Sequence, residues 1–228
     1  MNTMIEIVSA TRHAESDFWK ASALGISLRR LARDTRLVAN IAFQNHLGLP
    51  EIFNARIDAA GEHDILVFIH DDVWIDDYFL ADRLIQGLDV FDIIGVAGNR
   101  RRVPNQPAWL FIDDKLTMDA HANLSGSIAH GSHPFGPVSM FGACPSECEL
   151  LDGVLIAAKK SRLQDASVRF DPRFDFHFYD MDFCRQARSR GLRLGTWPVC
   201  LTHQSKGEGF NGAKWREKLL AYREKWKE

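Results

Sequence analysis

The feature that most constrains this chain is an unbroken apolar run, Ile65–Ile69, which ends abruptly in His70-Asp71-Asp72. A short apolar run bounded by polar residues predicts a strand that is buried in the core. In open α/β sheets, ligands bind beyond the carboxyl ends of the parallel strands. The acidic cluster therefore stands at a position where a site for chemistry is expected.

Short apolar runs alternate with helical patterns through the first half of the chain. This alternation is typical of βαβ units and predicts an α/β fold with a mainly parallel sheet. The segments that we expect to be strands are residues 5–8, 36–43, 65–69, 92–97, 150–158 and 192–201. The segments that we expect to be helices are residues 15–32, 50–60, 78–88 and 179–190, the last closed by Gly191.

Residues 99–148 break this regularity, because they are rich in Gly, Pro, Asn, Ser and His. Such a composition predicts loops and short strands. The segment also carries aromatic anchors, Trp109, Phe111, Phe135 and Phe141. We therefore expect it to form a wall or lid over a substrate site rather than a disordered linker.

Composition limits the class of protein. The chain has 228 residues, of which 46% are hydrophobic and 25% charged, and its formal net charge is −2, which suits one large globular domain. No basic excess indicates a nucleic-acid partner. The first residues lack the pattern of a signal peptide, and no apolar run approaches the roughly 18 residues of a spanning helix, so we expect a cytoplasmic protein.

The group His70-Asp71-Asp72 has two interpretations. Two carboxylates and an imidazole crowded together need a compensating cation. The carboxylate oxygen atoms suit Mg²⁺ or Mn²⁺ bound together with the phosphates of a substrate. Alternatively, Asp71 and Asp72 cap the turn and helix that follow. These residues alone do not decide between the two.

Two further clusters favour a site. Asp180 and Asp182 fall at the expected start of a helix, whose positive end stabilises carboxylates. They project in different directions, so one could face a cleft while the other holds the helix terminus. His203 follows the last expected strand in a polar loop and could bring an imidazole to the same crevice, or serve as a structural residue.

Five segments together resemble family 2 glycosyltransferases of the GT-A fold, most closely the short glycosyltransferase-like branch. They are IEIVSATR, LPEIFNARIDAAGEHDILVFIHDDVWI, ELLDGVLIAAKKSRL, FDFHFYDMDFCRQARSRGLRL and THQSKGEG. The resemblance implies a single Rossmann-like α/β/α domain over residues 1–228. Its nucleotide-sugar half would cover about residues 1–98 and its acceptor half about residues 99–228.

The resemblance also implies an activity: transfer of a sugar, with inversion, from a nucleotide-diphosphate sugar to a hydroxyl of a glycan or lipid-linked acceptor in glycan or polysaccharide synthesis. Mg²⁺ or Mn²⁺ would bind at Asp72, with His70 and His203 as further ligands, where the family usually has an acidic triplet. Asp180 would be the catalytic base, preceded here by Tyr179 instead of the common Glu. The implied donor-binding residues are Ser9, Ala10, Thr11, Arg12, Asn54 and Asp71, and the implied acceptor-binding residues are Asp152, Gly153 and Asp182. Asp152-Gly153 could equally form a structural turn.

Two rival functions remain. A metal-dependent nucleotidyltransferase would usually need a glycine-rich phosphate loop near the first strand, and the segment SATRHAES contains no glycine. A non-catalytic protein that binds nucleotide-sugars is the second rival, because His70 and Tyr179 replace acidic residues of the family.

An apolar stripe near the C-terminus has two interpretations. Trp215, Leu219, Tyr222 and Trp226 follow one helical face in a segment with a basic excess. The stripe either packs on the core or docks on an anionic membrane that carries the acceptor, which would place the protein at the inner face of the membrane.

Overall fold

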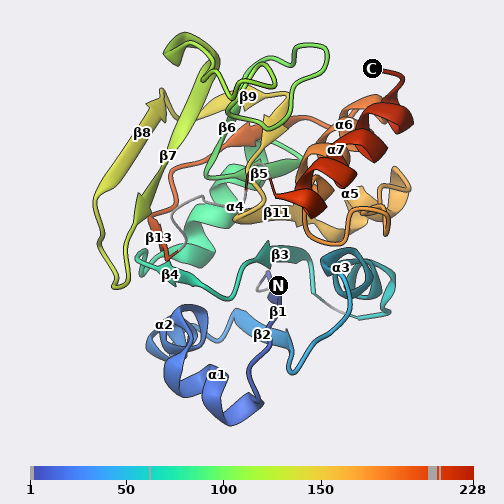
Figure 1. Ribbon diagram of the computed structural model, residues 1–228. Helices are drawn as coiled ribbons and strands as arrows, with labels where there is room; N and C mark the ends of the chain where they lie inside the picture. The colour runs from blue at the N-terminus through green and yellow to red at the C-terminus, as the bar shows by residue number, and fades with distance from the viewer. Residues whose placement is uncertain (1–2, 62, 205–209, 211) are drawn as a thin grey trace.

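Two β-sheets organise the chain, and the computed structural model describes residues 3–61, 63–204, 210 and 212–228 (Figure 1). The larger sheet has the strand order β2-β1-β3-β11-β5-β12-β9. Its strands are β1 (Ile5–Ala10), β2 (Leu37–Ala42), β3 (Ile65–Ile69), β5 (Ile93–Gly95), β9 (Ser146–Cys148), β11 (Leu155–Lys159) and β12 (Leu194–Thr196). Only β11 and β9 pair antiparallel with their neighbours, so the other strands run in one direction and the prediction of a mainly parallel sheet is confirmed.

The parallel register of β1 and β3 fixes the edge at which polar residues collect. Ile5 of β1 lies opposite Ile65 of β3, and Val8 lies opposite Phe68. The residues that follow the two strands therefore emerge side by side at one edge of the sheet. This register explains why Ala10 and His70 lie close to each other.

A second, smaller sheet was not predicted. Its strand order is β10-β6-β7-β13-β4, and β8 pairs with β7. The strands are β4 (Val73–Ile75), β6 (Ala97–Asn99), β7 (Leu124–His130), β8 (Val138–Gly142), β10 (Leu150–Leu151) and β13 (Leu201–His203). Three of the expected strands, 92–97, 150–158 and 192–201, are each divided into two short strands, one in each sheet.

The divided strands have local causes. Asp152-Gly153 turns the chain between β10 and β11, and Pro198, which cannot donate a ladder hydrogen bond, separates β12 from β13. The chain also passes from the larger to the smaller sheet between β3 and β4, where His70-Asp71-Asp72 lies. Polar residues of the expected site therefore stand at the crossings between the sheets.

Seven helices of the described residues cover the sheets. They are α1 (Glu15–Ala21), α2 (Ala23–Leu31), α3 (Leu49–Asp58), α4 (Leu80–Val90), α5 (Lys160–Asp165), α6 (Tyr179–Ser189) and α7 (Ala213–Trp226), and a 3-10 turn spans His121–Asn123. The expectation of one continuous helix over residues 15–32 is wrong. Ser22 has an extended backbone, and its side chain accepts a hydrogen bond from the backbone N–H of Gly25, so Ser22 caps α2 and ends α1.

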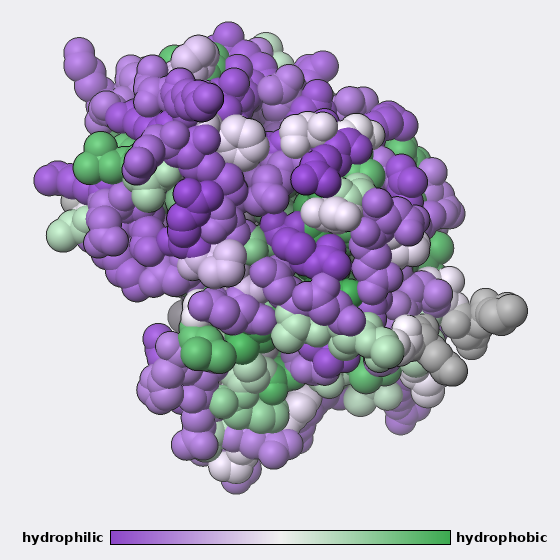
Figure 2. Space-filling model, turned by 90° about the vertical axis from the view of Figure 1, so that its right-hand side faces the viewer, coloured by the Kyte–Doolittle hydropathy of each residue, from purple (hydrophilic) through white to green (hydrophobic). Residues whose placement is uncertain are grey.

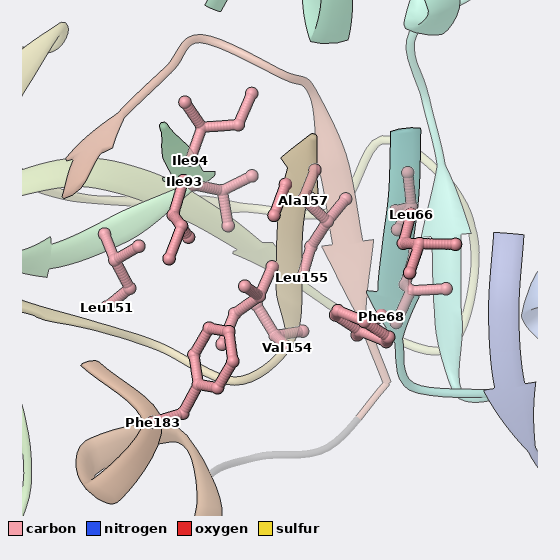
Figure 3. Packing of buried hydrophobic residues seen from close by; sticks show 14 of the residues in the cluster. Leu66, Phe68, Ile93, Ile94, Leu151, Val154, Leu155, Ala157 and Phe183 are labelled. Atoms are coloured by element: carbon pink, nitrogen blue, oxygen red, sulfur yellow. The ribbon is translucent and has the colours of Figure 1, made fainter. Parts of the chain in front are cut away.

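The core lies between the larger sheet and α6 (Figure 3). Leu66 and Phe68 of β3 and Ile93 of β5 are at most 1% exposed and, by their register through β11, lie on one face of the sheet. Phe183 of α6 is fully buried and points toward Val154 at the start of β11 (Figure 3). The ring of Phe183 also stacks on Phe170 at a centroid distance of 4.0 Å. This packing fixes α6, and therefore the acidic residues at its start, against the sheet.

Helix α7 packs on the core with its apolar stripe. Trp215, Leu219 and Tyr222 are buried, and Trp226 is partly buried against the same cluster. The right-hand side of Figure 1, which faces the viewer in Figure 2, is mostly hydrophilic in its upper part. Among the described residues, no helix combines the length and the apolar character that crossing a bilayer requires.

Candidate active site

A cavity of about 540 Å³ opens at the edge of the sheet where the expected site residues emerge. Its floor is formed by Ala10 and His70-Asp71-Asp72 at the strand ends, and by Tyr179 and Asp180 of α6. Residues 107–111 and the β8 residues Ser139 and Phe141 form its wall. The irregular middle of the chain therefore borders the site, in agreement with its expected role.

Three side chains, two from the crossing between β3 and β4 and one from the end of β13, form a group that could hold a metal ion. One ligand atom from each of His70, Asp72 and His203 lies within 4.8 Å of the others. Strand β13 pairs antiparallel with β4, so that His203 lies opposite Val73 and next to Asp72. The His203 Nε2 atom is 3.2 Å from the Asp72 Oδ1 atom. The carboxylate suits Mn²⁺ or Mg²⁺, whereas the two imidazoles favour a transition metal, so this group fits Mn²⁺ better than Mg²⁺.

The protonation states of this group are set by burial and by mutual contact. Burial opposes charge on His203 and on Asp72, but their hydrogen bond outweighs it, so the pKa of His203 is raised and that of Asp72 is lowered. Burial lowers the pKa of His70. A cation that binds this group would displace any proton on His203, because metal binding requires a neutral imidazole.

Asp180 lines the same cavity and lies in the first turn of α6. Its carboxylate accepts hydrogen bonds from the backbone N–H groups of Met181, at 2.8 Å, and Gly153, at 3.1 Å. Burial, followed by the negative charge of Asp152, nevertheless raises the pKa of Asp180 to about 7. A carboxylate with this pKa is suited to accept a proton near neutral pH.

The backbone just before Asp180 is strained. Phe178 has a φ of 67°, in the left-handed region that residues other than glycine rarely adopt. Its ring is buried and lies 5.5 Å from the Trp215 ring and 5.3 Å from the Tyr222 ring of α7. Packing against α7 thus holds the turn that aims Tyr179 and Asp180, a kind of strain that often occurs at functional sites.

The turn Asp152-Gly153 approaches α6 closely. Asp152 lines the cavity and accepts hydrogen bonds from the Trp109 indole N–H at 2.6 Å and from the Val154 N–H at 2.7 Å. A Cβ atom at Gly153 would lie 2.3 Å from the Tyr179 hydroxyl oxygen. Glycine is therefore required at this position for the turn to reach α6.

The predicted donor-binding residues divide into two groups. Ala10 and Asp71 line the cavity. Ser9 is buried, and its hydroxyl donates to the Ile69 carbonyl, which ties β1 to β3. Thr11 accepts from the His13 N–H, and the exposed Arg12 donates to the Asn45 carbonyl. Ser9, Thr11 and Arg12 therefore support the edge of the cavity without being among its lining residues.

Two predicted site residues make contacts within the fold, away from the cavity lining. The side chain of Asn54 exchanges hydrogen bonds with the backbone of Phe170 in both directions. Asp182 is fully buried and accepts from the Trp226 indole N–H at 2.9 Å, and the Lys225 Nζ atom lies 2.6 Å from its carboxylate. Neither residue belongs to the cavity lining, so the donor role of Asn54 and the acceptor role of Asp182 have no support in this geometry.

Sequence reasoning missed several residues of the cavity. His130 of β7 lies opposite His203 of β13, with ring centroids 6.2 Å apart. Phe176 stacks on His70 at 5.7 Å. The only signal for His130 in the sequence was its place in an irregular, histidine-rich segment, because its pairing with His203 depends on a sheet that was not predicted.

Comparisons with known proteins identify the fold. No model of a known protein family matches the sequence, and neither does any curated protein. Solved structures match at low identity. A variant of Drosophila β1,4-galactosyltransferase 7, in complex with manganese, UDP-Gal and xylobiose, has a TM-score of 0.53 and 8% identity, over 95% of this chain and 79% of that chain.

Two other solved structures agree with this match. Residues 1–349 of TarS from S. aureus have a TM-score of 0.52 and 11% identity, over 89% of this chain and 60% of that chain. GalNAc-T7 with UDP, GalNAc and Mn²⁺ has a TM-score of 0.51 and 10% identity, over 92% of this chain and 44% of that chain. The chain therefore has the GT-A fold, as the sequence predicted; at these identities the likeness establishes the fold alone.

Proposed function

We propose that this chain transfers a sugar from a nucleotide-diphosphate sugar to an acceptor hydroxyl, with inversion at the anomeric carbon, in glycan or polysaccharide synthesis. One observation carries the proposal. Within a GT-A fold, a group of possible metal ligands and a carboxylate with a pKa of about 7 share one cavity of about 540 Å³. The solved structures of similar fold that contain UDP or UDP-Gal together with manganese support the choice of donor and cation.

Asp72, His70 and His203 would hold Mg²⁺ or Mn²⁺. The donor set of one carboxylate and two imidazoles fits Mn²⁺ better than Mg²⁺, and the Asp72–His203 contact already fixes two of the three side chains. When bound, the cation neutralises the charge that develops on the departing diphosphate. The three residues orient the diphosphate end of the donor at the strand edge, with Ala10 and Asp71 beside it.

Asp180 would act as the base. Its carboxylate takes the proton of the acceptor hydroxyl as that oxygen forms a bond to the anomeric carbon, and the bond from this carbon to the diphosphate breaks. The backbone hydrogen bonds from Met181 and Gly153 keep the carboxylate oriented during this transfer. A positioned base contributes about 10²–10⁴-fold to such a reaction.

The wall of the cavity would bind the acceptor. Trp109 and Phe141 pack edge to face at 5.0 Å and present apolar surface beside Asp152. Aromatic rings next to a fixed carboxylate suit a sugar, which has apolar C–H faces and polar hydroxyl groups. We propose a glycan or lipid-linked sugar as the acceptor.

A donor panel tests the proposal. UDP-, GDP- and dTDP-sugars are incubated with the protein and Mn²⁺ or Mg²⁺, and release of the nucleoside diphosphate is measured. The Asp72→Ala variant should lose this release. The Asp89→Ala variant is the matched control, because Asp89 pairs with Lys159 on the surface and does not line this cavity.

The products distinguish the rival functions. A glycosyltransferase releases nucleoside diphosphate from one class of donor, whereas a nucleotidyltransferase forms or consumes pyrophosphate. Binding of a nucleotide-sugar without turnover, even with metal and a range of acceptors present, would favour a binding protein and contradict the proposed activity.

A further inference from the structure

The hydroxyl group of Tyr179 connects three segments of the site. It donates a hydrogen bond to the Gly153 carbonyl oxygen at 2.8 Å, and it lies 2.8 Å from the Nε2 atom of His70. Tyr179 is 3% exposed. The hydroxyl thus joins the end of β3, the turn before β11 and the first residue of α6.

The protons of this chain of contacts can be assigned. A phenol has one proton to donate and two lone pairs, whereas a backbone carbonyl only accepts. The contact with Gly153 therefore uses the single proton of Tyr179. For the contact with His70 to be a hydrogen bond, the Nε2 atom of His70 must carry the proton and donate it to the phenol oxygen.

We propose that Tyr179 is a positioning residue that holds neutral His70 in the tautomer with its proton on Nε2, which leaves the Nδ1 lone pair free to bind a metal ion. The metal part of this inference rests on the proposed function, and the tautomer itself does not. Tyr179 does not bind the metal; it fixes the ring that does.

The surroundings of His70 favour this arrangement. An ordinary phenol has a pKa of about 10, so the Tyr179 hydroxyl has a proton to donate near neutral pH. The ring of Phe176 stacks on one face of the His70 ring and so restricts its rotation. Metal-binding histidines commonly donate their second nitrogen to an oxygen, and loss of that partner typically weakens metal affinity about 10–100-fold.

The contact also ties the metal group to the base. Tyr179 and Asp180 are consecutive residues, and both bond to Gly153, Tyr179 through its carbonyl and Asp180 through its N–H. A change in Tyr179 therefore acts on His70 without removing either a proposed ligand or the proposed base.

Nitrogen NMR of the His70 ring tests the tautomer directly and needs no metal. In the parent protein at a pH where His70 is neutral, the proton is expected on Nε2, with a slow exchange rate. In Tyr179→Phe this slowly exchanging proton should be lost. A proton on Nδ1 in the parent protein, or an unchanged Nε2 proton in the variant, would overturn the proposal.

Mn²⁺ affinity, measured by calorimetry on the full chain, tests the consequence. Tyr179→Phe should bind Mn²⁺ about 10–100-fold more weakly than the parent protein. Tyr222→Phe is the matched control, because it removes an equally buried hydroxyl that bonds only to Arg185 among its described partners, and its affinity should be unchanged. Equal affinity in Tyr179→Phe and the parent protein would overturn the positioning role.

Gly153→Ala provides a second variant that keeps Tyr179. The Cβ atom of the new alanine would lie only 2.3 Å from the Tyr179 hydroxyl oxygen and would displace it. This variant should therefore also lose the slowly exchanging Nε2 proton of His70. Failure of the parent protein to bind Mn²⁺ would contradict the proposed function, whereas the tautomer would still be decided by NMR.

Discussion

The indole N–H of Trp109 donates a hydrogen bond of 2.6 Å to a carboxylate oxygen of Asp152. This contact joins the wall of the cavity, formed by the irregular middle of the chain, to the turn that lies against α6. Asp152 in turn raises the pKa of Asp180, so the wall, the turn and the proposed base form one connected unit.

Trp109→Phe should destabilise the protein by about 1–3 kcal/mol, because a partly buried carboxylate loses a donor. Denaturant unfolding measures this change. Trp74→Phe is the control, since the Trp74 indole N–H is buried without a partner in the described structure and its loss removes no hydrogen bond. Equal losses of unfolding free energy in the two variants would show that the Trp109–Asp152 hydrogen bond does not contribute to stability.

Asp180→Asn should lower kcat about 10²–10⁴-fold and leave donor affinity nearly unchanged. In the parent protein kcat/KM should rise with pH through about 7, because only the ionised carboxylate accepts the proton. A pH profile of the parent protein that is flat between pH 6 and pH 8 would contradict the base role.

Asp180 should also make stability depend on pH. Its folded-state pKa is raised from 3.8 to about 7, so the folded protein holds this proton more tightly than the unfolded chain. Its stabilising contribution is therefore complete below pH 4 and lost as the pH rises through 7. Thermal unfolding should show that Asp180→Asn gains stability relative to the parent protein between pH 5 and pH 8, and a difference that is independent of pH would refute the assignment.

Asp182→Asn should behave differently from Asp180→Asn, although the two residues share one helical turn. Asp182 is fully buried and paired with Lys225, and breaking a buried pair costs about 3–5 kcal/mol. We expect a large loss of stability in denaturant unfolding, with kcat of the folded fraction retained. A stable variant without turnover would assign Asp182 to the chemistry.

Mn²⁺ should stabilise the folded protein. At a concentration 100-fold above the dissociation constant, binding contributes about 2.7 kcal/mol, seen as a higher Tm that a chelator reverses. His203→Ala should lose most of this gain. An identical rise in Tm in His203→Ala would show that Mn²⁺ binds at a different site.

Local pattern was sufficient to predict much of the fold. The apolar run Ile65–Ile69 is a fully buried strand, and the acidic group after it lies at the cavity, because an unbroken apolar run followed by charge is a local signal. The start of α6 and the glycine after it were also predicted. The break at Ser22 was missed because apolar periodicity continues across it.

The second sheet and the different environments of Asp180 and Asp182 could not be predicted. Asp152-Gly153 indicates a turn within residues 150–158, but the local sequence does not show that Leu151 and Leu155, on its two sides, pair with strands of different sheets. The sequence around Asp180 and Asp182 does not show which of the two is the catalytic base. Only the packing of α7, which supplies Lys225 and Trp226, removes Asp182 from the cavity.

One experiment tests the proposed transferase site as a whole. Nucleotide release and donor binding are measured for the parent protein, Asp72→Ala and Asp180→Asn, with and without Mn²⁺. Metal-dependent release is expected from the parent protein only, with donor binding retained in Asp180→Asn and weakened in Asp72→Ala. Release that persists in Asp180→Asn, or that needs no metal, would refute the proposed roles of these residues.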